Sequence, residues 1–139
     1  MKVAAAAVIT ILQTASVFAG VEWDFAAPHK SRCSEGSQLD MNICMSKEAA
    51  QVDQKLSNLL QRLKLTLRTP ASALRAQAAW ERFRTNECEF ATSGLEKGES
   101  GYAFALYACR IDLAEKRIRD LSDHLEAICN GCPPRKEGE

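Results

Sequence analysis

The sequence has little of what catalysis needs. Histidine occurs twice, as His29 and His124, and neither has a nucleophile or an acid at a spacing typical of a catalytic set. Four convergent ligands for zinc are not evident. Carboxylates are plentiful but scattered over helical faces; a glycosidase-like pair of acids would leave no mark in the sequence, and nothing favours one. We therefore predict that the protein is not an enzyme, has no catalytic residue, and holds no metal or cofactor.

Net charge is also lacking. The 18 Lys and Arg residues equal the 18 Asp and Glu residues in number. Binding to phosphates needs a clear excess of cations, so this balance argues against nucleic acid as a partner. It argues equally against an electrostatic membrane binder.

Long apolar runs are missing except at the N-terminus. There a positively charged start precedes an apolar stretch from Val3 to Leu12, and Val17 and Ala19 are small enough for signal peptidase. The stretch is too short and too rich in alanine to span a bilayer stably. We predict a signal peptide over residues 1–19, cleaved after Ala19, rather than a buried N-terminal helix. The mature protein is then expected to be periplasmic or secreted, with no membrane insertion.

All six cysteines lie beyond this segment, and an even number behind a signal peptide indicates disulfides. Six cysteines allow fifteen pairings. Cys33 and Cys44 are close in sequence, and two antiparallel helices would bring Cys88 and Cys109 within bridging range. The spacing therefore favours these two pairs.

Cys129 and Cys132 are left over and form a Cys-x-x-Cys motif. A redox centre of this kind needs a helix N-terminus to lower the pKa of its first thiol. Here the motif lies at a predicted helix C-terminus, where the helix dipole disfavours a thiolate. We interpret the pair as a structural bridge rather than a redox centre.

The apolar periodicity predicts three helices and no strand. Apolar residues recur every three or four positions along about 38–68 and lie on one face of a helix over about 70–91. Over about 101–129 they drift around the helix axis, as expected of a helix that is contacted on two sides. Ser37 with Asp40 marks the start of the first helix, Pro70 marks the start of the second, and two glycines place a loop over 92–100. Short connections favour antiparallel neighbours. We predict an all-α fold: a small antiparallel three-helix bundle that is cross-linked by disulfides. An N-terminal arm precedes the bundle.

One helical domain is expected over residues 20–132, followed by a flexible charged tail over 133–139. The arm at the start of this domain carries Trp23 and Phe25. We interpret these aromatic residues as docked on the core rather than as anchors for a partner, because a small domain needs the buried area.

Three charged residues lie close to the apolar stripes of the predicted helices: Asp53, Arg84 and Arg117. Charges in such positions must pair if they are buried. The favoured interpretation is a structural Asp53–Arg84 bridge that fixes the register of two helices. The alternative is a polar site that solvent can reach.

These residues also belong to a longer pattern. Gln38 to Cys44 is followed by Asp53 and Leu56, then by the run from Ala76 to Cys88 with Trp80 and Arg84, and then by Cys109, Leu113, Arg117 and Leu121. This pattern resembles the LprI-type lysozyme-inhibitor domain, a family of small secreted helical domains of bacteria. The resemblance covers about residues 33–121. The sequence departs from the family pattern at Ser57, where Asn is usual, and at Phe83, where Tyr is usual. Cys129 and Cys132 lie beyond the matched region.

The resemblance implies a periplasmic or secreted inhibitor that binds and occludes a lysozyme-like muramidase or other cell-wall hydrolase. An immunity protein against a cell-wall-degrading toxin would share that mechanism. The matched residues Asp53, Trp80, Arg84 and Arg117 are interpreted as structural. Exposed candidates for contact with a partner are Leu95, Glu96, Lys97 and Glu99, in the loop between the second and third helices.

The near-neutral charge weighs slightly against animal-type lysozymes as targets. Animal-type lysozymes are strongly basic and attract acidic inhibitors, whereas this chain is near neutral. The alternative function is a non-enzymatic scaffold or interaction module of the cell envelope.

Overall fold

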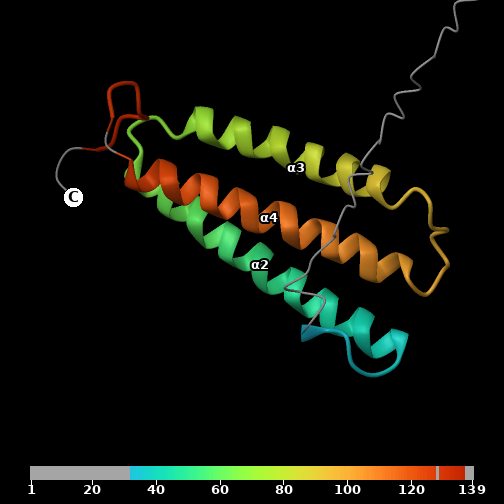
Figure 1. The fold of residues 1–139 in the computed structure, drawn as a ribbon. Helices are drawn as coiled ribbons and strands as arrows, with labels where there is room; N and C mark the ends of the chain where they lie inside the picture. The colour runs from blue at the N-terminus through green and yellow to red at the C-terminus, as the bar shows by residue number, and fades with distance from the viewer. Residues whose placement is uncertain (1–31, 128, 137–139) are drawn as a thin grey trace, which may run out of the picture.

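A computed structural model describes residues 32–127 and 129–136. The expected signal peptide and the arm with Trp23, Phe25 and His29 lie outside these residues. Three helices make up most of the described chain: α2 (Gln38–Thr66), α3 (Ala71–Ala91) and α4 (Tyr102–Glu126). Figure 1 shows that consecutive helices run antiparallel. The predicted all-α bundle with three helices is confirmed.

Helix α2 begins where the sequence supplies a complete cap. The Ser37 hydroxyl accepts a hydrogen bond from the Asp40 backbone N–H, and the Asp40 carboxylate accepts one from the Ser37 backbone N–H at 2.9 Å. This arrangement satisfies two backbone donors that a helix start would otherwise leave without partners. The predicted periodicity then continues along one buried stripe, which contains Met45, Ala49, Val52, Leu56, Leu59 and Leu63.

Helix α4 is the element on which both other helices pack (Figure 1). It contacts α2 most extensively and buries Ala108, Cys109, Ile111, Ala114 and Leu121. Helix α3 is held more loosely, and within it only Gln77 and Cys88 are buried. The outer helix α3 therefore depends on a few specific contacts rather than on a broad apolar face.

The core has two halves. One contains Met45, Ala49, Val52, Ala108, Ile111 and Ala114 beside Cys33, and the other contains Leu56, Leu59, Leu63, Leu67 and Leu121. Trp80 of α3 packs against both halves, as does Ile118 of α4. Each buried leucine stabilises the fold by about 1.5–3 kcal/mol relative to an exposed one. Trp80 is thus the main apolar link between α3 and the rest of the core.

The C-terminal segment differs from the prediction. Helix α4 ends at Glu126 rather than near Cys129, and residues 133–136, at the start of the expected tail, pair with the end of α2. The Arg68 N–H donates to the Pro134 carbonyl at 2.9 Å, and the Lys136 N–H donates to the Thr66 carbonyl at 3.0 Å. These bonds flank an isolated antiparallel bridge between Leu67 and Arg135.

Arg135 explains why this pairing forms. Its guanidinium donates hydrogen bonds to the backbone carbonyls of Leu125 and Ala127, the latter at 3.0 Å. The last carbonyls of a helix have no partner within the helix, and a cation near them also opposes the negative end of the dipole. A charged tail residue therefore caps α4 and holds the segment in place. Along the described chain, no helix is both long enough and apolar enough to span a membrane.

Candidate functional site

One polar cluster joins all three helices around the Trp80 ring. We call Asp53, Gln77, Trp80, Arg84 and Arg117 the Trp80 cluster. The guanidinium carbons of Arg84 and Arg117 lie 5.0 Å and 5.8 Å from the ring centroid. The ring face is electron-rich and attracts both cations. Arg84 comes from the same helix as Trp80, whereas Arg117 comes from α4.

Each arginine has a second partner. Arg84 Nη1 lies 2.5 Å from Asp53 Oδ1 on α2, so the predicted Asp53–Arg84 bridge is present. Arg117 donates from Nε to Gln77 Oε1 at 3.1 Å, and Gln77 in turn donates from Nε2 to Glu81 Oε1 at 3.2 Å. These contacts fix the position of α3 against both neighbours. They support the structural interpretation of the cluster.

Gln77 belongs to the Ala76–Cys88 run of the family pattern, but the sequence did not predict its contact with Arg117. The residue is 4% exposed and is one of two buried polar residues in the described chain. Its partner Arg117 is 40 positions away, on another helix. No local pattern marks such a pair, since glutamine is a common surface residue of helices.

Two hollows lie beside α3 in the described part of the chain. One of about 420 Å³ is lined by Ala78, Glu81, Arg82, Thr85 and Asn86, which all belong to α3. Another of about 260 Å³ is a groove between α2 and α3, with Leu60, Leu74 and Gln77 in its lining. Neither encloses a nucleophile with an oriented base. Among the described residues, no group of three or more His, Cys, Asp or Glu side chains could hold a metal ion.

The predicted contact residues lie at one end of the bundle, which we call the loop end and define as residues 33–45 and 87–106. Figure 1 shows that the α3–α4 loop and the start of α2 lie at the same end. The Asn42 side-chain amide donates to the Ser100 carbonyl at 2.9 Å and ties the two segments together. Leu95, Glu96, Lys97 and Glu99 are all exposed there.

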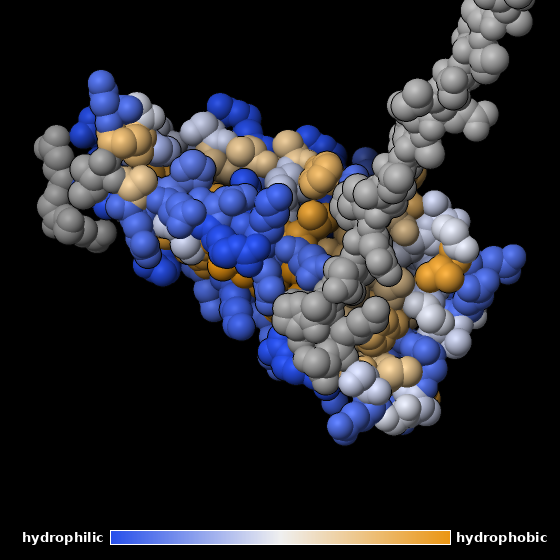
Figure 2. Space-filling view, in the orientation of Figure 1, coloured by the Kyte–Doolittle hydropathy of each residue, from blue (hydrophilic) through white to orange (hydrophobic). Residues whose placement is uncertain are grey.

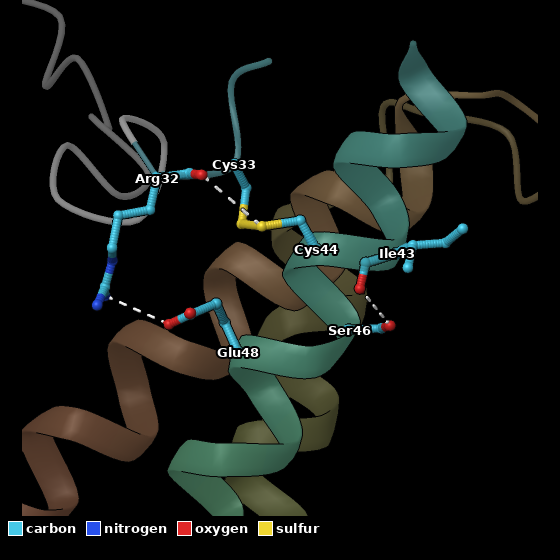
Figure 3. Close-up of a disulfide and its surroundings, with 6 residues drawn as sticks. All are labelled: Arg32, Cys33, Ile43, Cys44, Ser46 and Glu48. Carbon is cyan, nitrogen blue, oxygen red and sulfur yellow. Dashed lines mark hydrogen bonds and ion pairs between the residues drawn. A yellow bond between two sulfur atoms is a disulfide. The ribbon is translucent and has the colours of Figure 1, made fainter. Parts of the chain in front are cut away.

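Two disulfides brace this end. Cys88–Cys109 joins the end of α3 to α4, and Cys33–Cys44 joins the segment before α2 to its second turn. Figure 3 shows the second bridge with an ion pair beside it, in which Arg32 Nη2 lies 3.4 Å from Glu48 Oε2. The Ile43 side chain points away from the disulfide in this view and is 44% exposed. These are the two pairs that the spacing favoured.

The third disulfide, Cys129–Cys132, lies at the opposite end of the molecule and closes a tight turn. Gly131 within the turn has a φ of +93°, a backbone conformation that glycine adopts without steric cost. The turn directs the chain back from α4 towards the end of α2, where residues 133–136 pair. The structural interpretation of this motif fits the geometry.

The fold and the Trp80 cluster define a class of protein: a small all-α domain that is cross-linked by disulfides. The charged residues of the Trp80 cluster, which belong to the family pattern in the sequence, join its helices. The family model for lysozyme inhibitor LprI matches residues 30–121, and the chain belongs to this family. This match confirms the resemblance seen in the sequence. Neither the comparison with curated proteins nor the comparison with solved structures found a match.

Proposed function

We propose that the protein inhibits a lysozyme-type peptidoglycan hydrolase by binding the enzyme and occluding its glycan cleft. The observation that carries the proposal is the family match, which spans residues 30–121 and so includes all three helices up to Leu121 of α4. Inhibition by occlusion requires a rigid surface and no catalytic residues. The braced loop end supplies such a surface.

The proposed site of action is outside the cytoplasm. Three disulfides are stable in an oxidising compartment, which in bacteria means the periplasm or the exterior. Peptidoglycan hydrolases act in the same compartments. The expected signal peptide would direct export, and cleavage after Ala19 would release the mature chain there. An immunity role against a cell-wall-degrading toxin is a narrower form of the same proposal.

The test is an inhibition assay with the oxidised mature protein, residues 20–139. It is mixed with a panel of lysozymes and cell-wall hydrolases, and the clearing of peptidoglycan-bearing cells is followed by turbidity. We expect stoichiometric inhibition of at least one enzyme. The reduced and alkylated protein serves as the matched control, because it has the same sequence without the braced surface.

A second substrate separates two mechanisms. Hydrolysis of a soluble chito-oligosaccharide is measured with the same enzyme and inhibitor. Occlusion of the enzyme predicts equal inhibition on both substrates, whereas a protein that coats cell walls would protect only the insoluble one. A folded protein that inhibits no member of the panel would refute the inhibitor proposal and favour the envelope scaffold.

A further inference from the structure

Charge is separated along the bundle although the whole chain is neutral. The loop end carries six carboxylates and one cation: Glu35, Asp40, Glu87, Glu89, Glu96 and Glu99 against Lys97. All of these side chains except the half-buried Glu87 are exposed.

The opposite end, residues 60–76, 117–127 and 129–136, has the reverse balance. It carries eight cations and three carboxylates. The cations are Arg62, Lys64, Arg68, Arg75, Arg117, Arg119, Arg135 and Lys136, and the carboxylates are Asp120, Asp123 and Glu126. The two ends therefore cancel in the total charge. A neutral total hides an acidic surface at the loop end.

Exposed apolar side chains gather at the acidic end. Of the seven large hydrophobic residues that are exposed in the described chain, four lie there: Leu39 (67%), Ile43 (44%), Phe90 (75%) and Leu95 (37%). Figure 2 shows hydrophobic atoms at this end beside hydrophilic ones. Apolar anchors within a charged rim are the composition of protein-binding surfaces, and a bulky aromatic residue such as Phe90 is a typical anchor.

The loop end is also preorganised. Thr92 at the end of α3 is 4% exposed, and its hydroxyl donates to the Cys88 carbonyl at 2.7 Å. Backbone hydrogen bonds from Leu95 to Thr92 and from Glu99 to Glu96 form successive turns in the loop. The two disulfides and the Asn42–Ser100 hydrogen bond add to these contacts. Together they reduce the conformational entropy that the loop end would lose when it binds a partner.

We propose that the loop end is the surface that contacts the enzyme, and that it selects hydrolases whose cleft is rimmed by positive charge. This inference rests on the proposed function and names its surface and the chemistry of its partner. Six carboxylates steer a basic enzyme into contact, and Phe90, Leu39, Ile43 and Leu95 provide the desolvated area that slows dissociation. The charge of the loop end is thus complementary to strongly basic animal-type lysozymes, although the total charge of the chain argued against them as targets.

Glycines in the loop allow a direct steric test. A Cβ added at Gly94 or Gly98 would meet nothing within 4 Å, and neither residue has a positive φ. Gly98→Trp should therefore fold normally while placing bulk on the proposed contact surface. Glu96→Lys/Glu99→Lys tests charge at the same place without adding large bulk. Arg75→Glu/Arg119→Glu is the matched control, with two exposed charges reversed at the opposite end.

The measurement is the inhibition constant against a basic animal-type lysozyme, at low and at physiological ionic strength. Melting temperatures and circular dichroism verify that each variant is folded. We expect Gly98→Trp and the double Lys variant to weaken inhibition at least about tenfold, and the control to stay within about twofold. Salt should weaken inhibition by the wild type more than inhibition by the double Lys variant.

The outcomes separate the two proposals. If the wild type inhibits while both loop-end variants remain as potent, the loop-end assignment is overturned and the inhibitor function stands. If the wild type inhibits only hydrolases that lack a basic cleft, the proposed selectivity is overturned. If it inhibits no hydrolase at all, both proposals fall together.

Discussion

Arg84 Nη1 lies 2.5 Å from Asp53 Oδ1, and this ion pair connects α3 to α2. The two partners are unequally placed, since the Arg84 side chain is 18% exposed and the Asp53 side chain is 51% exposed. Solvent screens the charge of Asp53, so the Coulomb part of the interaction is modest. Arg84 has a further contact, because its guanidinium stacks over the Trp80 ring.

This asymmetry predicts unequal effects of substitution. Asp53→Asn should lower the free energy of unfolding by less than about 1 kcal/mol. Arg84→Ala should lower it by about 1–2 kcal/mol, because it removes the stacking and the packing of the arginine stem as well as the ion pair. Urea unfolding of both single variants and the double variant measures the two losses in the free energy of unfolding and the coupling between them. Equal losses from the two single variants would contradict this account.

Gln77 carries the second prediction. Gln77→Leu should destabilise the protein by about 1–2 kcal/mol, because the half-buried Arg117 Nε–H would lose its acceptor. The control is Gln61→Leu on α2, where the glutamine is exposed and no more than about 0.5 kcal/mol is expected. Chemical unfolding measures both. Similar values for the two variants would mean that the Gln77–Arg117 bond does not hold α3.

The disulfides should differ in their contribution to stability. They close sequence separations of 21 residues for Cys88–Cys109, 11 for Cys33–Cys44 and 3 for Cys129–Cys132. Loop-closure entropy then predicts losses of about 3 kcal/mol for each of the first two and about 1.5 kcal/mol for the third when both cysteines become alanine.

Thermal unfolding of the three double-alanine variants checks this order. The variant that lacks Cys129 and Cys132 should also inhibit like the wild type, because its bridge lies at the end away from the loop. A loss of inhibition in that variant, with the protein still folded, would place the opposite end in the contact with the enzyme.

Local signals accounted for much of the fold. The Ser37–Asp40 pair predicted the start of α2, and leucines spaced by three or four residues predicted its buried stripe. The glycines at 94 and 98 placed the loop between α3 and α4 correctly. These features depend on neighbours within one or two helical turns, and such neighbours are visible in a sequence.

Long-range features were not visible in the same way. The bond between Gln77 and Arg117 and the pairing of Leu67 with Arg135 each join residues on different elements. The acidic loop end was missed for a related reason: its carboxylates come from two distant segments, and the chain total cancels them. The contact residues Leu95, Glu96, Lys97 and Glu99 remain a prediction.

The pKa of Asp40 predicts a pH dependence of stability. The Ser37 hydroxyl and then the Ser37 backbone N–H donate hydrogen bonds to the carboxylate, and they lower the Asp40 pKa below its usual value of 3.8 despite slight desolvation. A carboxylate with a depressed pKa stabilises the folded state fully above the unfolded-state pKa. This contribution is lost as the pH falls through the lower, folded-state pKa.

Asp40→Asn should therefore be less stable than the wild type at pH 6, and the difference should shrink as the pH falls below 3.8. Urea unfolding of both proteins from about pH 6 to about pH 2 measures this difference. Glu35→Gln is the matched control, since Glu35 is an exposed acid in the same segment but outside the cap. A difference between Asp40→Asn and the wild type that stays constant to the lowest pH would mean that the charged carboxylate does not stabilise the start of α2.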